Sequence, residues 1–249
     1  MTAMLTLDHV SRQFGGLKAV DDVSFSVAKG EIVGLIGPNG AGKTTLINII
    51  TGVHPATSGR VLFEDSDMTR ARSYQIARRG LARTFQIVQP FPKMTVVDNV
   101  AAGALFCGHA GSVSEARDIA REHLEFTGLI DVAERPAASL TLARRKRLEL
   151  AKGLAMRPRL LMLDEVNAGL NQTEVDSALA IIRKIAGQGV TIIVIEHLMK
   201  VVLSISDRLL VLHHGQLIAQ GPPRDVVKDQ RVIEAYLGAK YAAQREAVH

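Results

Sequence analysis

The chain has 249 residues, of which 47% are hydrophobic, enough for one substantial core or one core with a small appended subdomain. The single cysteine, Cys107, excludes an internal disulfide and indicates a reducing compartment. The net charge of +5 is modest for this size and permits attraction to anionic lipid or nucleic acid, but an ordinary basic surface is the better explanation. Only 4% of residues are aromatic and tryptophan is absent, so we expect no platform for stacking single-stranded bases.

The sequence predicts no segment of its own that enters or crosses a membrane. The first residues lack the basic start and unbroken apolar run of a signal peptide. A transmembrane helix needs about 18 or more consecutive apolar residues, and no such run is found. We therefore expect a membrane role only through a partner.

Strand patterns dominate the first quarter of the chain. Val23, Phe25 and Val27 alternate with small residues, which predicts a strand with one buried face. Residues 60–63 have a similar character, and the apolar residues 32–36 predict a buried strand that follows a turn at Gly30.

The most specific motif follows the strand at 32–36 and precedes a helix at 46–50, which ends at Gly52. It has the spacing G-x-x-x-x-G-K-T, in which backbone N–H groups surround phosphates, the lysine reaches the β/γ oxygens and the threonine hydroxyl ligates Mg²⁺. Its residues are Gly37, Pro38, Asn39, Gly40, Ala41, Gly42, Lys43, Thr44 and Thr45. The strand–loop–helix context, with the helix N-terminus toward the anion, predicts a nucleoside triphosphate site.

The central part of the chain is predicted to be helical. Ser112 and Glu115 form a capping-box pattern in a helical region from about Gly103 to Gly128, and a second helix is expected from Leu142 to about Met156. A third begins after Asn171, with Glu174 completing a capping box and an apolar stripe at Val175, Ala178, Leu179, Ile182 and Ile185. A hairpin is expected at 213–215, and the last residues, about 241–249, have the low apolar periodicity of a disordered tail.

Two further buried strands end in polar clusters. Residues 160–163 lead into Asp164 and Glu165, and residues 191–195 lead into Glu196 and His197. Asp164 suits a Mg²⁺-holding carboxylate and Glu165 a base that polarises an attacking water, a role that contributes about 10²–10⁴ in rate. Because ligands bind outside the carboxyl ends of parallel strands, we expect these clusters and the phosphate-binding loop to converge on one crevice.

In this order and spacing the motifs resemble the ATP-binding cassette (ABC) family over nearly the whole chain. The resemblance implies that Phe14 stacks on adenine, that Gln86 binds both nucleotide and metal, and that His197 is catalytic. It also implies a D-loop at 168–171 and a signature at 140–144. Segments 81–86, 94–100, 195–202 and 231–238 are similar to the ATPase subunits of branched-chain (hydrophobic) amino acid importers. Relatives that carry urea, short amides or lipopolysaccharide share much of this vocabulary.

The signature segment departs from the family pattern Leu-Ser-Gly-Gly-Gln. Thr141 keeps a hydroxyl for the γ-phosphate, but Ala143 replaces a glycine whose backbone approaches that phosphate, and Arg144 replaces glutamine. The run at 144–147 is best explained as a solvated basic face, and the alternative is that Arg144 supplies a compensating charge to the phosphate. Val166 also stands where the family usually has proline.

The resemblance implies an α/β fold: a P-loop NTPase core with an N-terminal antiparallel β-element and a helical subdomain inserted at about 87–157, in one domain spanning 1–240. It implies an ATP- and Mg²⁺-dependent transport ATPase on the cytoplasmic side of the inner membrane. Its expected partners are a second ATPase subunit, transmembrane permeases contacted through Gln86 and residues 89–92, and indirectly a solute-binding protein. The alternatives are a regulatory subunit that barely hydrolyses ATP and an ABC protein acting on ribosomes or DNA, for which 249 residues leave no room.

Overall fold

The structure, a computed structural model, describes residues 3–85, 89–196 and 198–237. The chain divides into two compact units, of which the first comprises Met1–Ser73 and Thr191–His249 and the second Tyr74–Val190. Gln86, His197 and the predicted tail at 241–249 lie outside the described residues. That the whole of 1–240 acts as one domain stays a prediction.

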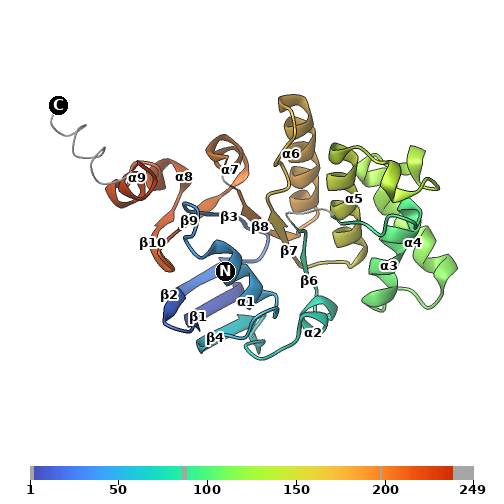
Figure 1. Cartoon of the computed structure of the whole chain (residues 1–249). Helices are drawn as coiled ribbons and strands as arrows, with labels where there is room; N and C mark the ends of the chain where they lie inside the picture. The colour runs from blue at the N-terminus through green and yellow to red at the C-terminus, as the bar shows by residue number, and fades with distance from the viewer. Residues whose placement is uncertain (1–2, 86–88, 197, 238–249) are drawn as a thin grey trace. The chain divides into compact units, whose positions relative to one another are not determined.

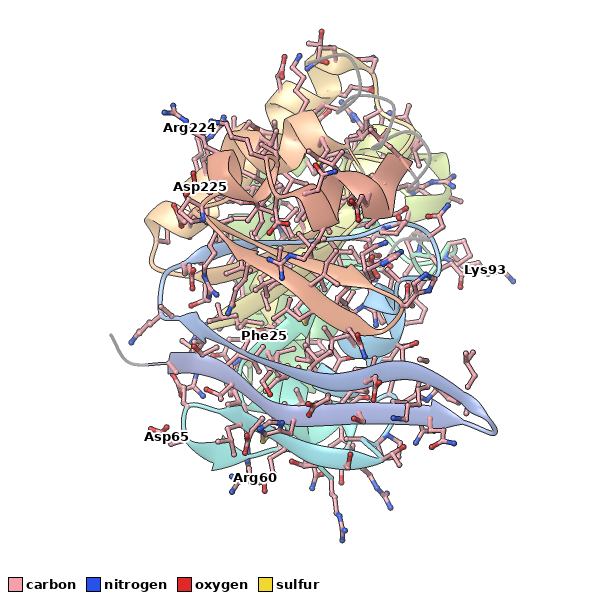
Figure 2. The ribbon with its side chains drawn as sticks, turned by 90° about the vertical axis from the view of Figure 1, so that its left-hand side faces the viewer. Phe25, Arg60, Asp65, Lys93, Arg224 and Asp225 are labelled. Atoms are coloured by element: carbon pink, nitrogen blue, oxygen red, sulfur yellow. The ribbon has the colours of Figure 1, made fainter. Side chains whose placement is uncertain are left out.

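An antiparallel sheet in the first unit has the strand order β2-β1-β4-β5. Its strands are β1 (Ala3–Phe14), β2 (Leu17–Ala28), β4 (Ser58–Phe63) and β5 (Ser66–Asp67). Alternate residues of β2, namely Val23, Phe25 and Val27, are buried as predicted, whereas Arg60 of β4 is exposed. Figure 2 shows Phe25 on the face of this sheet that lies toward β10 (Gln216–Gly221), and Arg60 pointing away from the opposite face.

A second sheet of the first unit positions the phosphate-binding loop. Within this unit its strand order is β10-β9-β3-β8, with β3 (Ile32–Ile36), β8 (Thr191–Ile195) and β9 (Arg208–His213). β3 pairs in parallel with both β8 and β9, and all five of its residues are buried. β9 and β10 form the predicted hairpin, in which His214 and Gly215 adopt φ of 47° and 80°.

Helices cover this second sheet. They are α1 (Lys43–Ile50), α7 (Met199–Ile205), α8 (Pro223–Val226) and α9 (Gln230–Leu237). Val202 of α7, Val226 of α8 and Val232 of α9 share one buried cluster with Ile36 at the end of β3. The C-terminal helices are therefore anchored to the strand that leads into the phosphate-binding loop.

The second unit contains a parallel strand pair and a group of helices. Arg83 of β6 (Leu81–Arg83) pairs with Met162 of β7 (Leu160–Asp164). The helices are α2 (Ser73–Arg78), α3 (Val96–Phe106), α4 (Val113–Thr127), α5 (Leu142–Ala155) and α6 (Gln172–Gly187), with short 3₁₀ turns at Ile130–Val132 and Ala137–Ser139. In Figure 1 α3, α4 and α5 lie side by side, and their apolar faces form one buried cluster.

One predicted helix start and one predicted capping box differ from the structure. The helical region starts at Val96 rather than about Gly103, because the Thr95 hydroxyl caps α3 by accepting the Asp98 N–H at 3.1 Å. The capping box at Ser112 forms only in part: Ser112 accepts the Glu115 N–H, but the Glu115 carboxylate accepts the N–H of Gly111 at 2.7 Å.

Helix α6 agrees with its prediction in full. Asn171 and Glu174 form a complete capping box, with hydrogen bonds of 3.0 and 2.9 Å. The predicted apolar stripe is buried throughout. The helix predicted from Leu142 to about Met156 is α5, which ends at Ala155.

Candidate functional site

The phosphate-binding loop joins the buried strand β3 to helix α1, as predicted. Gly37, Gly40 and Gly42 adopt φ of 152°, 78° and 100°. A Cβ on Gly37 would lie 2.2 Å from the Leu212 oxygen, and one on Gly42 would lie 2.4 Å from the Ala19 oxygen. Two of the three glycines are therefore required by neighbouring backbone as well as by conformation.

The N-terminus of α1 is suited to an anion. Its N-cap, Gly42, supplies no side-chain hydrogen bond, and no acidic residue lies in its first turn. The N–H groups of the first turn and the helix dipole therefore present positive potential at Lys43, Thr44 and Thr45. Thr44 is exposed, as are Asn39 and Gly40 in the loop.

The side chain of Lys43 lies over its own loop. Its Nζ donates to the Gly37 oxygen at 2.6 Å and to the Pro38 oxygen at 3.0 Å. The ammonium is thus held at the start of the loop, by two of its carbonyl oxygens. This position concentrates one mobile cation and several fixed donors in one cradle.

Phe14, at the end of β1 in the same unit, keeps 41% of its surface exposed. Its ring makes an edge contact with His54 at 5.6 Å between centroids, and the Arg12 guanidinium lies 4.5 Å from the ring centre. An exposed aromatic ring fixed by two neighbours is suited to stacking on a planar base.

Asp164, at the end of β7 in the second unit, is buried and paired. Its Oδ2 lies 2.7 Å from Nη2 of Arg83. Its N–H donates to the Thr84 hydroxyl at 3.2 Å. The strand pair β6–β7 therefore holds the carboxylate rigidly.

Glu165 begins a turn with φ of 49°, in the left-handed region that a non-glycine residue rarely adopts. Its backbone oxygen accepts a hydrogen bond of 2.8 Å from the Nζ of Lys146, a buried residue of α5. The turn that presents the Glu165 carboxylate is thus fixed by a cation from the signature helix. Val166, in place of the family's proline, is buried.

The signature segment starts helix α5. Thr141 is the N-cap and its hydroxyl accepts the Arg144 N–H at 3.4 Å. Ala143 lies in the first turn, and the Arg144 guanidinium pairs with Asp131 at 2.9 Å. These contacts give Thr141 and Arg144 roles within the unit.

The interpretation of 144–147 as a solvated basic face is wrong. Lys146 is buried, and Arg144, Arg145 and Arg147 are half-buried. Arg145 donates to the Ala138 oxygen and Arg147 to the Ser177 hydroxyl, both at 2.9 Å. Lys146 is therefore not a surface charge, and each of the three arginines contacts a group of its own unit while staying partly exposed.

Phe14 and the loop 37–45 therefore lie in the first unit, and Asp164, Glu165 and the signature in the second. Gln86 and His197 are outside the described residues, and convergence of all clusters on one crevice stays a prediction. Sequence reasoning missed Arg83 and Lys146. In the sequence Arg83 stands within a family segment and Lys146 within a charged run, and no local pattern indicates the partner of either residue.

Comparison with known proteins identifies the class. Residues 20–168 match the family described as ABC transporter, and residues 216–242 match the one described as branched-chain amino acid ATP-binding cassette transporter. The chain belongs to the ABC transporter family, and it is an ABC-type transport ATPase with the nucleotide-binding cassette predicted from its sequence.

Particular relatives cover nearly the whole chain. It is 39% identical to the high-affinity branched-chain amino acid transport ATP-binding protein BraF of Pseudomonas aeruginosa, over 94% of this chain and 98% of BraF. It is 40% identical to LivG of Escherichia coli, which carries the same description, again over 94% and 98%. The crystal structure of the ADP conformation of MJ1267, an ATP-binding cassette of an ABC transporter, has a TM-score of 0.87 at 33% identity, covering 96% of this chain and all of MJ1267. The predicted α/β cassette fold is therefore confirmed.

Proposed function

We propose that this chain is the ATP-binding and ATP-hydrolysing subunit of an importer for branched-chain or other hydrophobic amino acids. The observation that carries the proposal is the match of residues 216–242 to the branched-chain amino acid cassette family, supported by the identity to BraF and LivG. The matched segment includes α8 and α9, which pack on Ile36 beside the phosphate-binding loop. The distinguishing part of the chain is thus joined to its nucleotide site.

In this proposal the first unit binds ATP. Phe14 stacks on the adenine, the loop from Gly37 to Thr45 surrounds the phosphates, and Lys43 turns its ammonium toward the β/γ oxygens. The fit rests on two observations of the loop. A Cβ at Gly42 would meet backbone at 2.4 Å, which leaves a cradle that only glycine permits, and the first turn of α1 has no acidic residue.

Mg²⁺ is the cofactor that these residues fit. Among the described residues no group of three or more His, Cys, Asp or Glu could hold a metal by itself. The donors Thr44, Asp164 and Gln86 are all oxygen ligands, and Mg²⁺ is usually held by one or two protein oxygens together with substrate phosphates. When bound, it would neutralise charge on the β- and γ-phosphates.

Glu165 accepts the proton of the attacking water, and His197 acts with it. Thr141, Ala143 and Arg144 face the nucleotide of a second ATPase subunit across the dimer.

Residues 89–92, with Gln86, contact transmembrane permeases, so that the chain lies on the cytoplasmic side of the plasma membrane. A solute-binding protein delivers the amino acid to those permeases. Among the described residues no helix is both long and apolar enough to cross a membrane.

The decisive experiment isolates the chain from membranes with its permease and binding protein, and measures uptake of leucine and urea by the reconstituted complex. We expect leucine uptake that requires ATP. Its rate should fall at least about tenfold with Glu165→Gln, and Lys43→Ala should abolish it. The Glu165→Gln complex should still bind ATP. Uptake of urea but not of leucine would show that the transported solute is urea and not a hydrophobic amino acid. Near-normal turnover of the Glu165→Gln complex would show that Glu165 is not the base.

A regulatory subunit with weak hydrolysis is the second candidate. Its motive is the altered signature, because the Cβ of Ala143 stands where a family backbone approaches phosphate and, in the proposed dimer, would weaken hydrolysis at the site that this chain forms with the partner's loop. Mixed complexes that carry Glu165→Gln only in this chain, or only in its partner ATPase, separate the two. Loss of turnover with the partner's variant alone would favour the regulatory function.

A further inference from the structure

A buried ion pair joins the proposed metal ligand to the strand that leads into Gln86. Nη2 of Arg83 lies 2.7 Å from Oδ2 of Asp164, and each side chain is only 9% exposed. A carboxylate buried to this degree needs a partner charge. The negative charge of Asp164 is therefore already neutralised in the structure, by a residue of its own unit.

This pairing conflicts with metal binding at the same carboxylate. A guanidinium is permanently charged and cannot be deprotonated to make room. Two cations at one carboxylate repel each other strongly in a buried environment. Arg83 must therefore withdraw from Asp164, or share it at a cost, when a divalent cation binds there.

The guanidinium also contacts a ring two residues along the chain. The Cζ atom of Arg83 is 5.1 Å from the centre of the Phe85 ring, within the range of a cation–π contact. Phe85 keeps 55% of its surface exposed, and it directly precedes Gln86. A shift of Arg83 thus changes the contact on an exposed ring beside the segment proposed to face the permease.

We propose that Arg83 is the counter-ion of Asp164 in the metal-free subunit, and that its displacement by the bound metal is transmitted to Phe85. Arg83 is a positioning residue in this scheme, since it acts through Asp164 and does not touch the reacting atoms. The inference rests on the proposed role of Asp164 as a metal ligand.

Metal affinity tests the proposal directly. ADP-saturated full-length protein is titrated with Mn²⁺, and free Mn²⁺ is followed by electron paramagnetic resonance. Arg83→Gln should raise Mn²⁺ affinity by about 5- to 150-fold, the range typical of coupled binding events. Its affinity for ADP in EDTA should stay within about twofold of the wild type, because no metal then competes.

Arg117→Gln is the matched control. Arg117 lies in the same unit and pairs with Asp98 at 2.8 Å and Glu134 at 2.7 Å, so this variant removes one cation without touching Asp164. We expect its Mn²⁺ affinity to equal that of the wild type. An Arg83→Gln affinity that is unchanged, lower, or raised no more than in the control would overturn the proposal.

A second measurement does not depend on the folding of Arg83→Gln. Because the chain has no tryptophan, Phe85→Trp places a single reporter beside Arg83. Adding Mg²⁺ to the ADP-bound protein should change its emission, and adding Mg²⁺ to the same variant without nucleotide should not. An emission spectrum that does not change when Mg²⁺ is added to the ADP-bound protein would refute the proposal that the displacement of Arg83 reaches residue 85.

The failure of this inference can be distinguished from failure of the proposed function. Absence of ADP binding by the wild type in EDTA, or Mn²⁺ affinity unaffected by Asp164→Asn, would overturn the proposed site and this inference with it. Normal ADP binding and an Asp164-dependent Mn²⁺ site, without an effect of Arg83→Gln, would overturn this inference alone.

Discussion

Asn99 is the internal clamp of the segment proposed to contact the permeases, and replacing it with alanine is expected to destabilise the second unit. Its side chain lies on α3 and is fully buried. The amide oxygen accepts the Phe91 N–H at 2.8 Å, and the amide nitrogen donates to the oxygens of Phe91 at 3.1 Å and Thr95 at 2.9 Å. One side chain thus ties residues 91–95 to the helix that follows them.

The structure sets the size of the effect. Each hydrogen bond contributes about 0.5–1.5 kcal/mol to folding, so three contribute roughly 1.5–4.5 kcal/mol. Phe91 is 55% exposed, so its backbone groups regain water in part once the amide is gone. We therefore expect Asn99→Ala to lower the free energy of unfolding by about 2–4 kcal/mol.

The assay is urea denaturation of the full chain, followed by circular dichroism. The midpoint should fall while the slope m stays constant, because the surface exposed on unfolding hardly changes. Gln172→Ala is the control, since this amide of α6 is exposed and makes one hydrogen bond, of 2.9 Å, to Asp176. A loss below about 1 kcal/mol for Asn99→Ala, or one equal to that of the control, would refute the reasoning.

Three further predictions concern both units. Gly42→Ala should abolish detectable binding of a fluorescent ATP analogue, because its Cβ would lie 2.4 Å from a backbone oxygen; retained affinity would contradict the cradle. Burial raises the pKa of Glu31, but hydrogen bonds from Arg208 and a backbone N–H outweigh it and lower the pKa below its ordinary 4.5. The Glu31–Arg208 pair therefore stabilises the folded state fully above pH 4.5 and progressively less as pH falls through the lowered pKa. Glu31→Gln should therefore flatten the acid limb of Tm against pH, and an unchanged limb would exclude the pair. Lys146→Met should lower kcat of the assembled transporter by roughly tenfold or more without changing ATP affinity, since it removes a charged donor from the Glu165 oxygen; unchanged kcat would exclude this positioning role.

The elements that sequence predicted well carry their signals locally. The loop at 37–45 is fixed by glycines at required positions between a buried strand and a helix, and the start of α6 by Asn171 and Glu174 three residues apart. In each case the residues that form the recognisable pattern are neighbours along the chain. The start of α3 also carries a local signal, the N-cap Thr95 with Asp98 three residues on, and the start predicted near Gly103 is wrong because it leaves this cap out.

The contacts that sequence missed join distant residues. Arg83 and Asp164 are 81 positions apart, and they meet only because β6 and β7 pair in one particular register. Lys146 stands in a run with three arginines, and nothing in the sequence of that run distinguishes it from them. It is buried because the left-handed turn at Glu165 leaves a carbonyl that requires a donor at that place. Neither the register nor the turn is visible in local composition.

The altered signature can be understood from the start of α5. Ala143 lies within a helix, where alanine is about 1 kcal/mol more favourable than the glycine of the family pattern. The replacement therefore costs the fold nothing, and in the proposed dimer any cost arises at the nucleotide of the partner subunit. Arg144 and Asp131 are 40% and 57% exposed, so their ion pair is worth at most about 1 kcal/mol and holds the guanidinium weakly. A phosphate at this helix start can therefore replace Asp131 as the partner of Arg144 at little cost. The weak ion pair thus permits Arg144 to supply the compensating charge in the proposed dimer.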